Sequence, residues 1–236
     1  MISDRAESSS AAIFEKNWQR YRTVMANNLM YHREVYRELH RILINEAPRP
    51  FRFLDIACGD ASCTVECLKG TAVASYHGID LSQPALDLAS TFLETLGCPF
   101  KLENREFLDA VTHMSEAVDV VWIGQSLHHL LLREKRMLVR KIREIVGVRG
   151  LFLIWEPVRL EGESEEGWYD RFVSKRPLWS VLSDEDFAEI DNHHRTSDHP
   201  ETDHVWRLLG TESGFARVDE IFRAPNNLAR VYQFRQ

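Results

Sequence analysis

The 236-residue chain is 44% hydrophobic and 28% charged, a balance typical of a folded globular protein, which excludes disorder for most of its length. Its formal net charge is −7, and it has neither a long basic run nor an apolar stretch of membrane-spanning length, so we expect no nucleic acid and no membrane as a partner. The first ten residues are polar and do not resemble a signal peptide, which favours a cytoplasmic location.

The first part of the chain is predicted to be helical. Residues 14–25 and 35–43 carry apolar side chains at helical spacing, and both stretches end before Pro48. Two amphipathic helices therefore precede the first predicted strand. We interpret residues 1–48 as an N-terminal helical lid.

From Phe51 onward, short apolar runs alternate with helical ones. Strands buried on both faces are predicted at 51–57, 73–79, 118–123 and 151–155, with helices at 83–96 and 133–146. Alternation of this kind predicts a parallel sheet with helices on both faces, which is a doubly wound α/β fold.

The end of the chain follows a different pattern. Residues 217–223 and 229–235 flank the turn sequence 224–227 and predict a hairpin, so the last strand is expected to run antiparallel. About sixty residues separate this hairpin from the strand before it, more than one crossover helix requires. We interpret residues 157–201 as a cap inserted into a main domain at 49–236.

A turn of small residues follows the first strand. Ala57, Gly59 and Ala61 occupy the small positions, and Asp55 ends the strand. At such turns, backbone N–H groups face the ligand and small side chains let it approach. The glycines of the dinucleotide fingerprint are missing, and a carboxylate here repels a pyrophosphate but suits an ammonium group.

The second strand also ends in an acid, Asp80. A carboxylate at this strand end is placed to accept hydrogen bonds from ribose hydroxyls. Nucleoside cofactors in general share this feature.

Together, these residues resemble the class I S-adenosylmethionine-dependent methyltransferases over about residues 51–155, with a weaker echo in the C-terminal hairpin. The resemblance implies a Rossmann-like fold with a seven-stranded, mostly parallel sheet and S-adenosyl-L-methionine as the cofactor. It implies methyl transfer to an oxygen or nitrogen atom of a small-molecule acceptor. Its implied cofactor contacts are Asp55, Ala57, Gly59, Asp80, Leu81, Glu106, Phe107, Gly124 and Gln125. Ala57 and Glu106 depart from the family, where Gly and Asp are commoner.

The acceptor side is predicted from side-chain chemistry. A hydroxyl acceptor needs a base to take its proton, and the candidate catalytic residues are His129, His193, His194 and Glu156. Aromatic and apolar residues of the lid and cap are candidates for the pocket wall. Of these, Tyr21 is assigned to the cofactor, and Met30, His32 and Trp179 to the substrate.

Two alternatives remain open. The chain from His193 to His204 is rich in histidine and carboxylate side chains, which suit zinc or iron, so a metal-dependent enzyme is one alternative, although we assign no metal ligand. The other is a module that binds the cofactor without catalysis. Residues 191–200 are otherwise expected to form a polar loop before a helix at 201–211. Monomer and homodimer are both compatible with the sequence.

Overall fold

The computed structural model of this protein describes residues 19–236. Within them, strands form one sheet in the order β3-β2-β1-β4-β5-β8-β7, and the short strand β6 pairs with β5 outside this path. The strands are β1 (Phe51–Ile56), β2 (Val73–Asp80), β3 (Phe100–Asn104), β4 (Val118–Gly124), β5 (Val146–Arg159), β6 (Glu201–Thr202), β7 (Arg217–Arg223) and β8 (Ala229–Arg235). The first ten residues, on which the expected location rests, and the first part of the predicted lid lie outside the described residues.

The direction of the strands matches the prediction. β1 pairs in parallel with β2 and β4, β2 with β3, and β4 with β5. β8 runs antiparallel to both β5 and β7. The doubly wound, mostly parallel sheet with an antiparallel last strand is thus confirmed, and the bounds of the C-terminal hairpin are those predicted.

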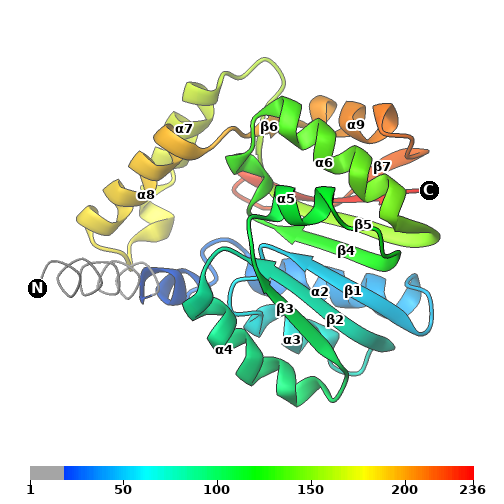
Figure 1. Cartoon of the computed structure of the whole chain (residues 1–236). Coiled ribbons are helices and arrows are strands. Elements are labelled where there is room, and N and C mark those ends of the chain that lie inside the picture. The colour runs from blue at the N-terminus through cyan, green and yellow to red at the C-terminus, as the bar shows by residue number, and fades with distance from the viewer. Residues whose placement is uncertain (1–18) are drawn as a thin grey trace, which may run out of the picture.

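Helices cover both faces of the sheet (Figure 1). α5, α6 and α9 pack on one face and α2, α3 and α4 on the other, each group contributing to its own buried apolar core. The helices are α2 (His32–Asn45), α3 (Ser62–Leu68), α4 (Gln83–Leu93), α5 (Phe107–Thr112), α6 (Leu132–Ile145), α7 (Glu165–Val173), α8 (Asp184–Ser197) and α9 (Asp203–Glu212), with short 3-10 turns η1 (Glu94–Leu96), η2 (Leu127–His129) and η3 (Arg176–Trp179). Residues 19–26 are also helical.

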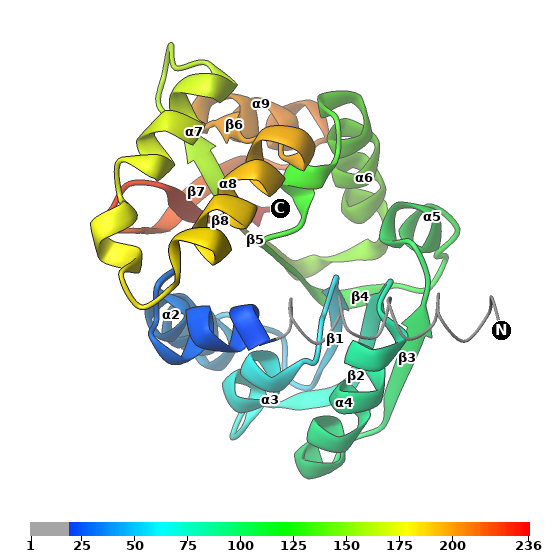
Figure 2. The ribbon, with the colours of Figure 1, turned by 90° about the vertical axis from the view of Figure 1, so that its left-hand side faces the viewer.

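The helices α7 and α8 stand apart from the two layers, across a gap from α2 in Figure 2. They share a third apolar core, in which Phe172 stacks on Phe187 with ring centroids 5.0 Å apart. Val24 of the N-terminal segment and Leu228 of the β7–β8 connection belong to the same core. The cap is therefore packed against the first described helix as well as against the end of the sheet.

One predicted loop is wrong. Residues 191–197 are the last two turns of α8, whose start is capped by the Ser183 side chain accepting from the Asp186 N–H. The helix was missed because Phe187 is its only buried side chain, so its sequence lacks a clear apolar stripe. The next helix begins at Asp203 rather than at residue 201, because the Thr202 side chain caps it.

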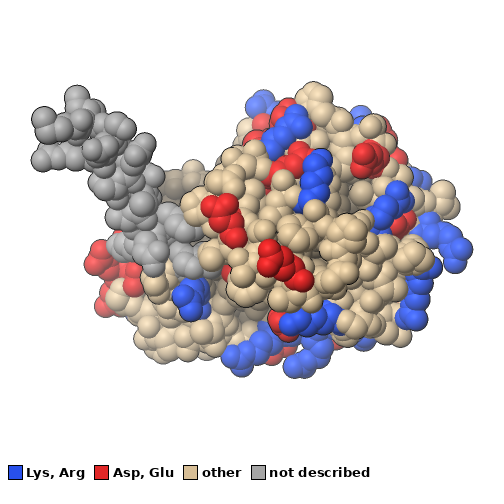
Figure 3. Space-filling view, turned by 60° about the horizontal axis from the view of Figure 1, so that its bottom comes forward, with Lys and Arg blue, Asp and Glu red and all other residues tan. Residues whose placement is uncertain are grey.

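The charged surface agrees with the composition. On the face shown in Figure 3, Lys and Arg are interspersed with Asp and Glu and form no continuous basic stripe. Among residues 19–236, no helix combines the length and the apolar character that crossing a membrane requires.

The packing of α9 on the sheet yields a stability prediction. A Cβ atom on Gly210 would lie 2.9 Å from a ring carbon of Phe234, and Val218 is also in contact. At a solvent-exposed position of a helix, replacing Gly with Ala stabilises the protein. At position 210 the added methyl group would instead overpack the contact with the sheet, so we expect Gly210→Ala to lower the free energy of unfolding by about 1–3 kcal/mol. Urea unfolding measures the change. Thr211→Ala, at the exposed neighbouring position, is the matched control, and an unchanged or raised stability for Gly210→Ala contradicts the packing argument.

Candidate active site

Asp55 lies at the carboxyl end of β1 and is 2% exposed. One of its carboxylate oxygens accepts a hydrogen bond from the Tyr76 hydroxyl at 2.7 Å. Burial raises the pKa of Asp55 to about 7, a shift that its hydrogen bonds with Tyr76 and Thr64 oppose. Near neutral pH the carboxyl group is therefore close to half ionised, and a neighbouring cation would favour its charged form.

The turn after β1 leaves the backbone accessible. Ala57, Gly59 and Ala61 all have positive φ, of 57°, 54° and 55°. No atom lies within 4 Å of the position that a Cβ on Gly59 would occupy, so the turn faces open space there. The left-handed backbone at residue 57 explains why glycine is the usual residue at this place in the family that the sequence resembles.

Asp80 connects the ends of β1 and β2. One carboxylate oxygen accepts from the Gly59 N–H and the other from the Ser82 N–H, both at 2.8 Å. Each oxygen keeps a second lone pair for a further donor. Leu81 beside it is 67% exposed, which leaves an apolar surface next to the acid.

Glu106 is held by the start of α5. Its two side-chain oxygens accept from the Leu108 and Asp109 N–H groups at 3.0 and 2.8 Å, which makes it the N-cap of the helix. Phe107 is buried in the core beneath. Both residues lie at the start of α5, immediately after β3, and the carboxylate of Glu106 is engaged by the helix.

The exit of β4 is fixed by a buried acid. Glu156, on β5, is 0% exposed, and its oxygens accept from the N–H groups of Ser126, Leu127 and His128. Gln125, which follows Gly124 at the end of β4, has a φ of 58° and donates its N–H to the Trp155 carbonyl at 2.7 Å. Glu156 is thus engaged in shaping the turn after β4.

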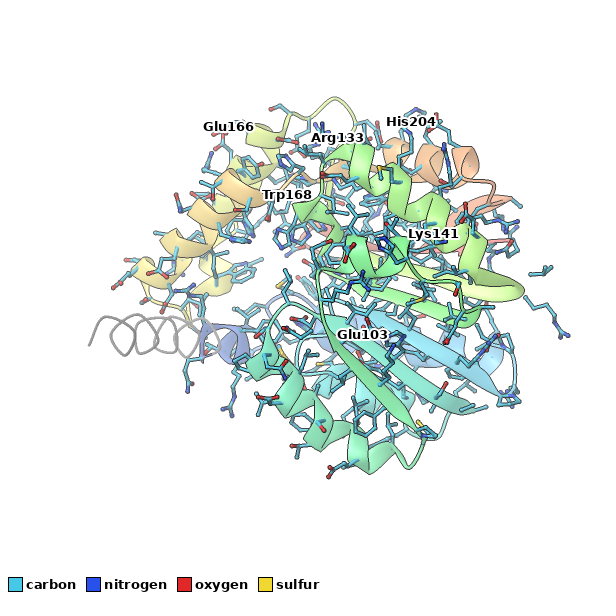
Figure 4. The ribbon with its side chains drawn as sticks, viewed as in Figure 1. Glu103, Arg133, Lys141, Glu166, Trp168 and His204 are labelled. Carbon is cyan, nitrogen blue, oxygen red and sulfur yellow. The ribbon has the colours of Figure 1, made fainter. Side chains whose placement is uncertain are left out.

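A cavity of about 870 Å³ opens between the cap, the N-terminal segment and this turn. Met30, Gln125, Trp168 and Trp179 are among the residues that line it. Figure 4 labels Trp168 on the side of α7 that faces the rest of the molecule. The volume lies within the range of small-molecule sites.

Four histidines surround one carboxylate at the wall of this cavity. Asp198, at the end of α8, is 2% exposed. The nearest nitrogens of His129, His193 and His194 lie 3.2, 3.5 and 3.8 Å from its oxygens. Burial lowers the pKa of His194 to about 4. The structure therefore brings these three predicted catalytic histidines together, and it joins Glu156 to them through His128, whose Nδ1 lies 2.8 Å from a Glu156 oxygen.

The predicted lid residues take different positions. Tyr21 is 41% exposed as a residue. Desolvation of its hydroxyl raises its pKa, and Cys63, Asp60 and Asp55 add to the shift, which places the phenol close to the turn after β1. Tyr21 also lines the cavity. His32 is buried behind Trp155, with ring centroids 4.9 Å apart, and burial lowers its pKa to about 4.

Other residues of the site were not predicted. Asp198 and His128 are not among the predicted site residues, yet both are central to the histidine cluster. Asn226, in the β7–β8 connection, lines the cavity, as do Arg20 and Asn192. The signals available in the sequence were the histidine- and carboxylate-rich stretch from His193 to His204, which contains Asp198, and the His194–Asp198 spacing of about one helical turn.

Residues 54–152 match the model of a methyltransferase domain, and this span contains Asp55, Gly59 and Asp80. Residues 54–152 therefore form a methyltransferase domain, which covers less than half of the 236-residue chain. The predicted Rossmann-like methyltransferase fold is confirmed.

Solved structures of other proteins share the methyltransferase fold. An O-methyltransferase family protein from Burkholderia thailandensis is 18% identical, with 89% of this chain and 57% of that chain covered and a TM-score of 0.63. The magnesium protoporphyrin IX methyltransferase of Synechocystis, solved with bound SAH, is 13% identical, with 94% of both chains covered and a TM-score of 0.59.

Mitomycin 7-O-methyltransferase is 13% identical, with 85% of this chain and 53% of that chain covered and a TM-score of 0.57. The chain thus spans only 57% and 53% of the lengths of two of these three structures. No curated protein sequence matches this chain.

The left-handed backbone at Ala57 yields a test of the turn. Ala57→Gly should raise the free energy of unfolding by about 1 kcal/mol, because glycine adopts this conformation without a Cβ clash. Ala188→Gly, at an exposed position of α8, should instead lower the free energy of unfolding by a similar amount, because glycine is unfavourable inside a helix. Chemical denaturation of both variants measures the two changes, and destabilisation by Ala57→Gly would show that the turn is not strained as described.

Proposed function

We propose that this methyltransferase transfers the methyl group of S-adenosyl-L-methionine to an oxygen or nitrogen atom of a small-molecule acceptor bound in the 870 Å³ cavity. One observation carries the proposal: Gln125 and Tyr21 both line this cavity. Gln125 follows β4, which pairs with the strand β1 that carries Asp55, and Tyr21 lies near Asp55 and Asp80. Space for an acceptor therefore adjoins a site suited to a nucleoside.

The residues present fit the cofactor. Burial disfavours the charged form of the Asp55 carboxyl, so a cationic ligand group beside it would be stabilising. Gly59 faces open space, where a ligand can approach the backbone. We assign the ammonium group to Asp55, the ribose hydroxyls to Asp80 and the adenine to the apolar surface at Leu81. Ala57, Glu106, Phe107 and Gly124 complete the proposed cofactor site, with Glu106 acting through the start of α5.

When bound, S-adenosylmethionine supplies a methyl group on a positively charged sulfur, and transfer leaves the electron pair of the broken C–S bond on that sulfur. The protein's part is to align the acceptor and exclude water, which is worth roughly 7–11 kcal/mol for well-oriented reactants. Met30 and Trp179 supply apolar walls for the acceptor, and the buried His32 packs against Tyr21, which also lines the cavity, with ring centroids 6.1 Å apart. His193 and His194, on the cavity wall, are the proposed acceptors of a proton from a hydroxyl, and His129 lies next to them beside Asp198.

The N-terminal segment and the cap complete the site in this proposal. Val24 shares an apolar core with α7 and α8, which supports residues 1–48 as a lid and 157–201 as a cap on the domain 49–236. A module that binds the cofactor without turnover is the competing function. It would bind S-adenosylmethionine and transfer no methyl group to any small-molecule fraction of a cell extract.

Binding of the cofactor should depend on pH through Asp55. Its folded-state pKa of about 7 means that the carboxyl is protonated, and unable to pair with an ammonium group, as the pH falls below 7. Between pH 7.5 and 5.5 we expect calorimetry to show the affinity for S-adenosylmethionine falling by about 25-fold, because only the ionised carboxyl pairs with the ammonium group. Asp55→Asn should bind weakly at both pH values, whereas Asp87→Asn on exposed α4 should behave as wild type. Equal affinity at the two pH values in the wild type argues against this pairing.

Filling the cavity should block the acceptor without affecting the cofactor. Met30→Trp places a larger side chain at the wall, and we expect incorporation of labelled methyl into an extract's small-molecule fraction to fall at least tenfold while the cofactor Kd stays within about twofold. Met137→Trp, at an exposed position of α6, is the control. Methyl transfer to protein or RNA alone, unaffected by Met30→Trp, would refute the small-molecule assignment.

A further inference from the structure

The carboxylate of Asp198 has an unusual environment. Its Oδ1 atom is buried and accepts no hydrogen bond, although the residue is only 2% exposed. Three imidazole nitrogens face this one oxygen: His129 Nδ1 at 3.2 Å, His193 Nε2 at 3.5 Å and His128 Nε2 at 3.8 Å. An unpaired buried carboxylate oxygen is costly, so the arrangement calls for a positive charge among these atoms.

The orientation of His128 supports a metal ion as that charge. Its Nδ1 lies 2.8 Å from a Glu156 oxygen, and a ring nitrogen facing a carboxylate carries the proton. Its Nε2 then presents a lone pair toward Asp198 at 3.8 Å, too long for a hydrogen bond. A carboxylate behind a histidine that presents its other nitrogen is the usual second layer of a metal site.

The distances suit a small cation. The ligand atoms of His128, His129 and Asp198 lie within 4.8 Å of one another. Zinc binds nitrogen at about 2.0–2.1 Å and carboxylate oxygen at about 2.0–2.2 Å in tetrahedral geometry, which places neighbouring ligand atoms about 3.3 Å apart. The contacts to Asp198 therefore need to change by only a few tenths of an ångström.

The backbone that carries these ligands is fixed from two sides. The His199 N–H donates to the His128 carbonyl at 2.7 Å, and the Tyr169 hydroxyl donates to the Asp198 carbonyl at 2.6 Å. The buried Lys135–Glu201 ion pair, at 2.8 Å, ties α6 to the same segment. The two ligand-bearing segments, 70 residues apart in sequence between His128 and Asp198, are held together by the fold before any ion binds.

We propose that His128, His129 and Asp198 bind a divalent transition metal of the zinc class at the wall of the acceptor cavity, with His193 as a further ligand or as a neighbouring base. With three protein ligands, the ion keeps a position open for an oxygen of the acceptor. A metal-bound hydroxyl loses its proton more readily, here to His193 or water, and the oxygen keeps the electron pair with which it attacks the methyl carbon. This catalytic role rests on the proposed function, whereas the binding of metal does not.

Metal binding is measured on the full chain without cofactor. Protein stripped with a chelator is titrated with Zn²⁺ against a chromogenic competitor, and the expected result is one ion per chain. His129→Ala and Asp198→Asn should each lower the affinity by at least tenfold, and Glu156→Gln by about 10–100-fold. His204→Ala is the matched control, because His204 lies on α9, well away from α8 (Figure 4), and should bind as wild type.

Two further measurements keep the test independent of folding and of methyl transfer. His129 has a 41% exposed side chain, so His129→Ala should fold, which circular dichroism checks, even if the buried Asp198 variant does not. Co²⁺ in place of Zn²⁺ should give the visible absorption of a four-coordinate site. Less than a tenth of an ion per chain, an equal loss in His204→Ala, or a preference for Mg²⁺ would each overturn the proposal. Cofactor affinity measured on the same samples is expected to persist without metal, and its loss through Asp55→Asn leaves the metal site intact, so the two proposals fail separately.

Discussion

Parallel pairing places the carboxyl ends of β1, β2, β4 and β5 along one edge of the sheet, so the segments that leave these strands share one region of space. The acids Asp55, Asp80 and Glu156 all belong to this edge. Asp55 accepts a hydrogen bond from the Tyr76 hydroxyl of β2, whereas Asp80 and Glu156 accept from backbone N–H groups in the turns after β1 and β4. The parallel direction of these strands therefore brings together the turn after β1, the turn after β4 and the adjoining wall of the cavity.

Two buried acids, Asp55 at this edge and Asp198 at the end of α8, are unfavourable for the protein alone. Removing the Asp55 carboxyl from water raises its pKa to about 7, and the Asp198 oxygen has no hydrogen-bond donor. A ligand that supplies a positive charge at either place recovers part of this desolvation cost and binds only the folded state. Ligand binding is thus coupled to folding stability at both acids, through an ammonium group at Asp55 and a metal ion at Asp198 in the two proposals.

Elements with strong local signals were predictable from the sequence. The hairpin was found because alternating apolar strands flank a Pro-Asn-Asn turn, and the positions of Asp55 and Asp80 follow from the ends of two apolar runs. β5 is longer than predicted because its buried part continues through Glu156, Pro157 and Val158, where the apolar run of the sequence is interrupted, and because its beginning includes partly exposed residues at 147–149. The helical conformation of residues 191–197 and the capping role of Glu106 depend on local hydrogen bonds that apolar periodicity does not report. The cavity itself arises from side chains such as Val24 and Leu228, which meet only through tertiary packing.

The antiparallel direction of β8 has a practical consequence. Phe234 pairs with Phe152 near the beginning of the parallel run of β5, so the chain leaves the sheet at the edge opposite the cavity (Figure 1). The N-terminal segment, by contrast, contributes Tyr21 to the cavity wall. A fluorophore or an immobilisation tag attached behind Gln236 would therefore leave ligand access unobstructed.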